Sequence, residues 1–170
     1  MEYIAHRGVW NKKQEQNTLN SFLHAINDKR FSGFELDVRM NYQKNFFVYH
    51  NYLYKGKPFK NYETNFLKKE NITTLESVLN LKHNKIILIE IKDYDIDIRK
   101  FLEILDNCQN RKIYIMSFNN KVIEKIKKVT VESIKHLSRN AGFIEDIDEK
   151  GDVRPGKLLN VFKEETFNTY

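Results

Sequence analysis

Six consecutive residues near the middle of the chain, 86–91 (IILIEI), constrain the fold more than any other feature. The run is apolar at odd and even positions alike, which is typical of a strand covered on both faces in a parallel sheet. Further strands are expected over 3–6, 33–39, 46–50 and 112–116, and helical patterns separate most of them. Because strands that alternate with helices form parallel β/α units, the sequence predicts an α/β fold.

Residues that favour helix starts precede three of the expected helices: Asn17 or Thr18, Thr73 in capping-box spacing with Glu76, and Asp95 or Asp97. A fourth helix is expected over 119–128, and a weaker strand over 131–137. Between the third strand and the second helix, residues 51–71 read as a polar, aromatic-rich loop.

The length of 170 residues suits one domain with a sizeable core, so a single domain is expected over 1–170, with about 138–170 the most divergent part. No run approaches the roughly 20 apolar residues of a membrane span, and no secretory signal is visible. Cys108 is the only cysteine, which excludes an internal disulfide framework and predicts a small buried side chain. These features predict a cytoplasmic protein.

The formal net charge of +6 favours anionic partners such as phosphate esters or nucleic acid. The lysines are scattered, however, and those around 119–128 fit the solvated face of a helix. A nucleic-acid-binding function therefore rests on charge alone, and we expect no nucleic-acid partner.

Ionisable residues gather at the ends of four expected strands: His6 with Arg7, Glu35 with Asp37, His50, and Glu90 with Lys92. Side chains alternate along a strand, so Glu35 and Asp37 share one face, as do Glu90 and Lys92. In a parallel sheet, groups at the carboxyl ends of neighbouring strands converge on one site.

Three converging carboxylates repel one another unless a hard cation lies between them, and oxygen-only ligands favour Mg²⁺, Ca²⁺ or Mn²⁺. Two histidines suit proton transfer near neutral pH. Arg7 offers a fork for phosphate oxygens and Lys92 a point charge. Together these groups favour phosphoryl transfer over acyl transfer.

Each residue also has a structural interpretation. The acidic pair on 33–39 can be an exposed strand face, His50 a packing residue, and Glu90 with Lys92 a surface ion pair. Trp10 can wall the site or pack elsewhere. The remaining histidines are expected to be structural: His24, His83 and His136.

The ordered segments IAHRG, QNTLNSF, FELDV, VYH and IEIK resemble the glycerophosphodiester phosphodiesterase family over about residues 3–92, and KIYIMSF resembles it less closely over 112–118. The resemblance implies a TIM-type β/α barrel with the site at the carboxyl ends of its strands. It implies His6 and His50 as the acid/base pair, with a divalent cation held by Glu35, Asp37 and Glu90. It further implies that Arg7 and Lys92 bind the phosphoryl oxygens, and that a neighbouring glycerol hydroxyl attacks phosphorus to give a cyclic phosphate.

The chain departs from the family pattern in three ways. Gln16 stands where the family usually has Glu, and Asn51 stands where Asp is common. Only five to six strands are recognisable, whereas a barrel needs eight and typically about 250 residues. We therefore expect an incomplete or reduced barrel, and exposed strand edges would favour self-association.

Two functional hypotheses follow. The first is a metal-dependent phosphodiesterase acting on a small glycerophosphodiester or on a glycerol-phosphate polymer. The second is a weak or inactive relative that binds phosphoesters or a protein through the same pocket.

Overall fold

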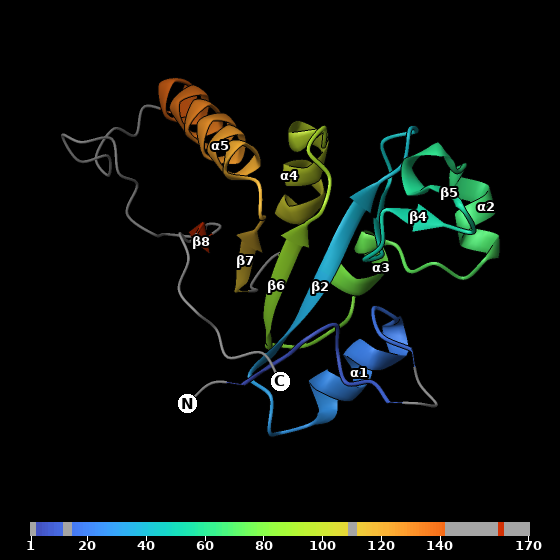
Figure 1. The fold of residues 1–170 in the computed structure, drawn as a ribbon. Coiled ribbons are helices and arrows are strands. Elements are labelled where there is room, and N and C mark those ends of the chain that lie inside the picture. The colour runs from blue at the N-terminus through green and yellow to red at the C-terminus, as the bar shows by residue number, and fades with distance from the viewer. Residues whose placement is uncertain (1–2, 12–14, 109–111, 142–159, 162–170) are drawn as a thin grey trace.

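A computed structural model describes residues 3–11, 15–108, 112–141 and 160–161. Its main sheet has the order β1-β2-β6-β7-β8, and each of these strands lies parallel to the next (Figure 1). The strands are β1 (Ile4–Ala5), β2 (Gly33–Met40), β6 (Ile86–Ile91), β7 (Ile113–Met116) and β8 (Asn160–Val161). The fold is α/β, with neighbouring strands in the order expected of consecutive β/α units of a barrel. Within the described ranges the sheet stays open, and no closed barrel is formed.

Strand β3 (Phe46–Val48) corrects the expectation of uniformly parallel strands. It pairs with β2 in antiparallel register, with Val38 opposite Val48 and Met40 opposite Phe46. The reversal is made by a tight turn in which the Asn41 backbone N–H donates to Asn45 O at 3.0 Å. The chain between β2 and β3 is too short for the dozen or more residues of a parallel crossover.

The helices are α1 (Leu19–Asn27), α3 (Leu75–Leu79), α4 (Ile98–Asp106) and α5 (Asn120–Ala141). Their apolar residues share one core cluster with alternate residues of β2 and β6, including Phe34, Leu36, Ile87 and Ile89. Because strand side chains alternate between faces, the acidic residues of these two strands lie on the opposite face of the sheet. The core therefore fixes the face on which the site is built.

Side-chain caps explain where three of the helices begin. Thr18 caps α1 in a reciprocal pair with Ser21, and the Asp97 carboxylate accepts from Lys100 N at the start of α4. For α3 the cap is Thr74, whose side chain accepts from Ser77 N, so the prediction of Thr73 was wrong by one residue. The strand predicted over 131–137 was also wrong, because α5 continues through it to Ala141.

Residues 51–71 are not the simple loop that was predicted. They form a hairpin of β4 (Leu53–Tyr54) and β5 (Lys57–Pro58), a 3₁₀ turn η1 (Phe59–Asn61) and a short helix α2 (Thr64–Lys69). Aromatic packing holds this segment on β3: Phe59 lies against Phe47 and Tyr49, with ring centroids 6.0 and 4.9 Å apart. The aromatic residues that suggested an irregular loop therefore build a second small core.

In the described part of the chain, no helix is both long and apolar enough to cross a membrane. Residues 142–159 and 162–170 lie outside the described ranges. The prediction of a divergent segment over about 138–170 within one domain therefore stays a prediction, as does self-association.

Candidate active site

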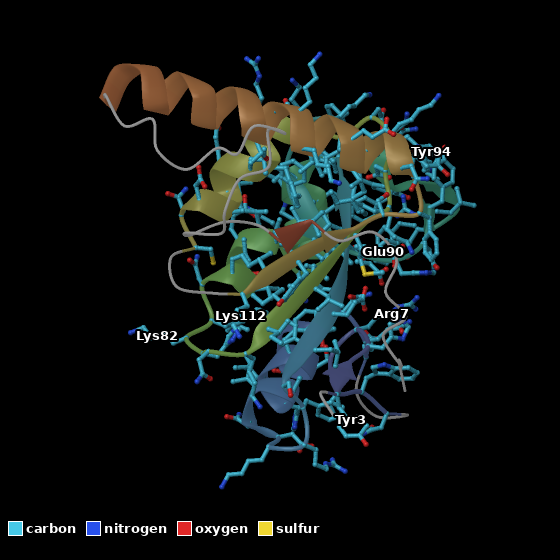
Figure 2. The ribbon with its side chains drawn as sticks, turned by 90° about the vertical axis from the view of Figure 1, so that its left-hand side faces the viewer. Tyr3, Arg7, Lys82, Glu90, Tyr94 and Lys112 are labelled. Atoms are coloured by element: carbon cyan, nitrogen blue, oxygen red, sulfur yellow. The ribbon has the colours of Figure 1, made fainter. Side chains whose placement is uncertain are left out.

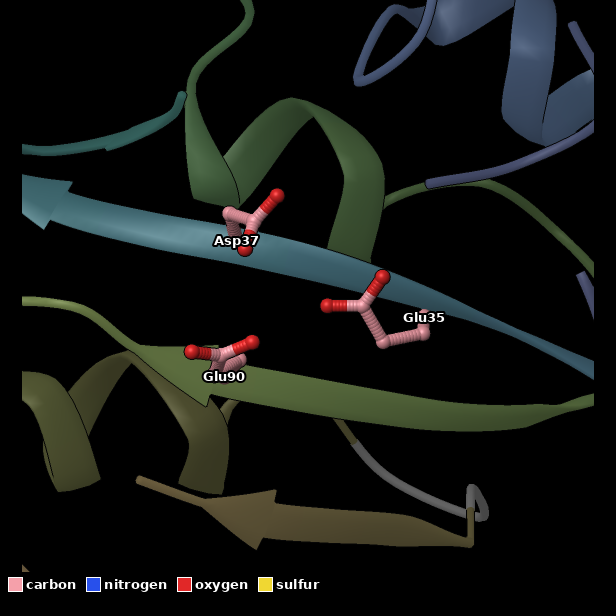
Figure 3. Close-up of side chains that lie close together, drawn as sticks. All are labelled: Glu35, Asp37 and Glu90. Carbon is pink, nitrogen blue, oxygen red and sulfur yellow. The ribbon is translucent and has the colours of Figure 1, made fainter. Parts of the chain in front are cut away.

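Three carboxylates meet on the face of the sheet opposite the main core, where β2 and β6 lie side by side. Glu35 and Asp37 come from β2 and Glu90 from β6, and the register places Asp37 directly opposite Glu90. One ligand oxygen from each residue lies within 4.8 Å of the others. All three residues are buried, with exposed fractions of 3%, 0% and 6%. Figure 3 shows the three carboxylates turned toward a common space.

Burial makes this cluster electrostatically unfavourable in the absence of a cation. Removal of the Glu35 carboxylate from water, followed by the nearby charge of Asp37, raises the pKa of Glu35 to about 8. The hydrogen bond from Arg7 N to Glu35 Oε2, at 3.0 Å, opposes this rise only in part. Two buried oxygens, Glu35 Oε1 and Asp37 Oδ1, make no hydrogen bond within the described structure. Asp37 Oδ1 has an ion-pair partner in Lys92 Nζ at 3.3 Å, whereas Glu35 Oε1 has neither a hydrogen bond nor an ion pair among the described residues. Because a buried polar atom without a partner is costly, the cluster fits a group that supplies positive charge.

Two basic side chains already border the acids. Lys92 Nζ lies 2.6 Å from Glu90 Oε1 and 3.3 Å from Asp37 Oδ1. Arg7 Nε lies 3.0 Å from Asp37 Oδ2, but not in hydrogen-bond geometry, and its Nη1 donates to Gln16 Oε1 at 3.1 Å. Figure 2 shows Arg7 and Glu90 on the same side of the sheet. These cations leave positive charge beside the carboxylates, where an anionic ligand can be held.

The first histidine follows β1 and reaches the acidic cluster. His6 Nε2 lies 3.9 Å from Glu35 Oε2. Burial, and next the positive charge of Arg7, lower the pKa of His6, and the charge of His50 acts in the same direction. His6 therefore lies at the edge of the acidic cluster.

The second histidine, His50, follows β3, and its position is fixed by its backbone. Arg39 Nε and Nη2 both donate to His50 O, at 3.1 and 2.9 Å. Its ring Nδ1 lies 2.8 Å from Asn51 Oδ1. In the family that the sequence resembles, Asp is common at this position. Asn51 therefore still offers a polar oxygen to the imidazole.

Asn17 is a site residue that was not singled out from the sequence. Its backbone is left-handed, with φ of 57°, and its N–H donates to Arg7 O at 3.0 Å. Its side chain clamps Asp37 twice, because Nδ2 donates to Asp37 Oδ2 at 2.7 Å and Oδ1 accepts from Asp37 N at 3.3 Å. The only signal was its place in the QNT segment beside Gln16.

Arg39 and Asp93 form an unforeseen pair beside the site. Arg39 Nη1 lies 2.5 Å from Asp93 Oδ1, and Asp93 Oδ2 accepts from Met40 N at 2.7 Å. Arg39 lies two residues after Asp37, so strand alternation places it on the site's face of β2. That alternation was the signal that could have identified it.

Six of the seven residues predicted for the site lie at the acidic cluster, and the seventh, His50, follows Tyr49, whose N–H donates to Asp37 O. The other singled-out residues lie apart from the site or border it. His24 is exposed on α1, and His83 lies edge-on to the Phe34 ring, with centroids 5.3 Å apart. Trp10 is half exposed and donates from Nε1 to His6 O at 3.1 Å, so it borders the site. Cys108 is partly exposed, in contrast to the buried position predicted, and its thiol contacts Leu79 O.

The donor set tests which metal the cluster fits. All three side chains offer oxygen only, and two of their oxygens lack a hydrogen-bond partner. Oxygen ligands suit hard divalent ions such as Mg²⁺, Ca²⁺ and Mn²⁺, whereas zinc sites usually include nitrogen or sulfur. The residues present therefore fit a hard divalent cation.

Comparison with solved structures identifies the architecture. The chain is similar to a glycerophosphodiester phosphodiesterase from Thermotoga maritima, at 29% identity and a TM-score of 0.64, over 75% of this chain and 59% of that one. It is also similar in fold to glycerophosphodiester phosphodiesterases from Agrobacterium tumefaciens (16% identity, TM-score 0.63, 76% and 63% coverage) and Parabacteroides distasonis (23%, 0.57, 69% and 56%). No protein-family model and no curated protein matches the sequence.

The chain spans about six-tenths of the length of these solved structures. They are TIM-type barrels. The similarity agrees with the resemblance carried by the sequence motifs. The chain is a relative of the glycerophosphodiester phosphodiesterases.

Proposed function

We propose that the protein is a divalent-metal-dependent phosphodiesterase that cleaves glycerophosphodiesters or a glycerol-phosphate polymer. The observation that carries the proposal is the gathering of three buried carboxylates within 4.8 Å, beside two basic side chains and two histidines. The similarity to glycerophosphodiester phosphodiesterases supports the same reaction class.

In this proposal Glu35, Asp37 and Glu90 hold one divalent cation, which is Mg²⁺, Ca²⁺ or Mn²⁺. Such a cation lowers the pKa of a coordinated hydroxyl and neutralises charge on the phosphoryl group. Arg7 and Lys92 bind phosphoryl oxygens, because both present positive charge at the edge of the carboxylate cluster.

His6 and His50 act as the acid/base pair. One imidazole takes the proton of the neighbouring glycerol hydroxyl as its oxygen bonds to phosphorus. The bond from phosphorus to the departing alcohol breaks, and the other imidazole donates a proton to that alkoxide. The product is a cyclic glycerol phosphate, which water then opens with the two roles reversed.

The proposal extends to the setting of the protein. We place it in the cytoplasm, with a small diester or polymer end as substrate and no nucleic-acid partner. Its single cysteine and its dispersed lysines support this setting.

The first experiment is an assay of glycerol p-nitrophenyl phosphate and alkyl glycerophosphodiesters with Mg²⁺, Ca²⁺ or Mn²⁺, beside EDTA-treated protein. Activity should disappear with EDTA and should fall at least about 100-fold in His6→Ala, since general acid–base catalysis contributes that much. The control is His24→Ala, which removes an exposed histidine of α1 and should change nothing. Activity that survives both EDTA and His6→Ala would eliminate the mechanism.

The roles of the two histidines can be separated by the leaving group. A p-nitrophenolate leaves without help from an acid, whereas an alkoxide needs a proton. The variant of the general acid should therefore lose far less activity on a p-nitrophenyl ester than on an alkyl ester. The variant of the general base should lose activity on both esters equally. If each variant, His6→Ala and His50→Ala, lost the same activity on the p-nitrophenyl ester as on the alkyl ester, the division of roles would be contradicted.

A second function is supported by one observation. Gln16 pairs with Arg7 where the family usually has Glu. This exchange suits a relative that binds phosphoesters without cleaving them. Saturable binding of glycerol 3-phosphate without turnover under any of the three metals would favour this function.

A further inference from the structure

Three exposed aromatic side chains border the site, each on a segment that follows a strand of the sheet. Trp10 follows β1, Tyr52 follows β3 and Phe118 follows β7. Their exposed fractions are 50%, 57% and 88%. Single exposed apolar residues are ordinary, so the contacts that these three rings make with the site decide whether they serve it.

Each ring contacts a different element of the site. Trp10 Nε1 donates to His6 O at 3.1 Å. The Phe118 ring centroid lies 5.7 Å from Lys92 Nζ, and Lys92 in turn pairs with Glu90. The rings therefore stand beside residues that the proposed function assigns to proton transfer and to phosphate binding.

Tyr52 occupies a third side. Its ring centroid lies 5.9 Å from Arg39 Cζ, and Arg39 donates twice to His50 O. The three aromatic residues, named here the aromatic rim, thus border His6, Lys92 and His50 from three separate segments.

The chemistry of the rim argues for an apolar group rather than a cationic one. An aromatic face attracts cations, but Lys92 and Arg39 already lie over the faces of Phe118 and Tyr52. A quaternary ammonium such as choline would meet these two positive charges, in a chain of formal net charge +6. Hydrocarbon meets no such repulsion and gains by leaving water.

We infer that the aromatic rim of Trp10, Tyr52 and Phe118 binds the apolar part of an uncharged leaving-group alcohol. The inference rests on the proposed function and adds a substrate class to it: glycerophosphodiesters of hydrocarbon-bearing alcohols, in preference to those of choline. Each CH₂ group that the rim covers should raise kcat/KM by about three- to fourfold.

The test uses glycerophosphodiesters of methanol, butanol and hexanol, together with a matched pair, choline and 3,3-dimethylbutanol. The last two alcohols have nearly the same shape and differ by one positive charge. The intact protein with Mg²⁺ should prefer hexyl over methyl and 3,3-dimethylbutyl over choline by about tenfold or more. A flat series, or a preference for the choline ester, would overturn the inference.

Variants show whether the rim causes the preference. Phe118→Ala should lower the ratio of hexyl to methyl kcat/KM by about tenfold, because the most exposed ring of the rim is lost. The control is Tyr3→Ala, since Tyr3 is also an exposed aromatic residue but lies beyond Arg7, away from Glu90 (Figure 2). An unchanged ratio in Phe118→Ala, or an equal fall in Tyr3→Ala, would contradict a role for the rim.

A fluorescence measurement separates failure of the inference from failure of the proposed function. Trp10 is the only tryptophan of the chain, so its emission reports on the rim whether or not turnover occurs. The hexyl diester should shift the emission to shorter wavelength at a lower concentration than the methyl diester. With that shift but no turnover, the rim stands and the phosphodiesterase proposal falls. With turnover but no shift, the phosphodiesterase proposal stands and the inference about the aromatic rim falls. If only lipid vesicles produced the shift, the rim would bind a membrane surface and not the alcohol of a substrate.

Discussion

Replacing Glu35 by Gln should stabilise the protein in EDTA at neutral pH, although it removes a proposed metal ligand. Burial and the charge of Asp37 raise the pKa of the Glu35 carboxyl from its ordinary value of 4.5 to about 8. Between these two values the folded protein binds a proton that the unfolded chain has released, so stability falls as the pH rises through this window. The Gln amide oxygen can still accept from Arg7 N, which lies 3.0 Å from Glu35 Oε2.

The size of the effect follows from the position of pH 7 within this window. Each pH unit above the unfolded-state pKa removes about 1.4 kcal/mol from the free energy of unfolding. At pH 7 the wild-type protein should therefore be less stable than Glu35→Gln by up to about 3 kcal/mol. Glu35 is only 3% exposed, so solvent screening reduces this value little.

Urea unfolding in EDTA at pH 5, 7 and 8.5 measures the difference. The wild-type protein should lose stability steadily over this series, while Glu35→Gln should stay nearly level. With Mg²⁺ the order should reverse, because a ligand at 1,000 times its Kd stabilises the wild-type protein by about 4.1 kcal/mol and the variant binds it poorly. The control is Glu103→Gln on α4, which removes an exposed carboxylate far from the cluster in sequence. Equal pH slopes for wild type and Glu35→Gln, or equal stabilisation by Mg²⁺, would refute the reasoning.

Three further predictions concern residues that support the site. Asn17→Ala should weaken Mg²⁺ binding about 10-fold or more by calorimetry, because it removes both hydrogen bonds that orient Asp37; an unchanged Kd would contradict the clamp. Asp93→Asn should lower the free energy of unfolding by about 3 kcal/mol in urea, because the buried Arg39 charge loses its partner; a loss below about 1 kcal/mol would show that solvent compensates. Gly8→Ala should unfold at a markedly lower temperature, because φ is +78° and the new Cβ would lie 2.5 Å from a side-chain oxygen of α1; an unchanged melting temperature would show that the loop shifts freely.

The acidic cluster could be predicted because it depends on short-range rules. Glu35 and Asp37 share a face by strand alternation, and Glu90 lies on the clearest strand of the chain. Neighbouring parallel strands then bring the three side chains together, as the pairing of Asp37 with Glu90 shows. Periodicity and strand order were sufficient for this part.

The supporting contacts could not be predicted because they depend on backbone geometry or on distant pairs. Asn17 reaches Asp37 only because residue 17 adopts a left-handed conformation, which propensity alone does not indicate for one Asn among many. Arg39 and Asp93 are 54 residues apart, and nothing local to either identifies the other. The helix over 131–137 was missed for a different reason: its β-branched residues favour a strand locally, but they continue a helix that had already begun at Asn120.

The position of His50 joins the fold to the proposed chemistry. The sequence led us to expect this histidine at the end of a parallel strand, but β3 is antiparallel and returns along β2 instead. The return brings Tyr49 N to Asp37 O at 2.9 Å, so His50 follows directly beside the acidic cluster. The location was therefore predicted for the wrong reason, since a hairpin and not a β/α unit delivers the histidine.

The turn of that hairpin depends in turn on the segment over 51–71. Asn41, which is fully buried, accepts from Asn45 N at 3.0 Å and donates to Thr64 Oγ1 at 2.9 Å, at the start of α2. Aromatic packing of Phe59 on Phe47 holds the same segment against β3. Because both contacts restrain β3, which leads to His50, residues 51–71 help to position this proposed catalytic histidine. A segment read from the sequence as a loop is thus part of the framework that sets the separation of the two imidazoles.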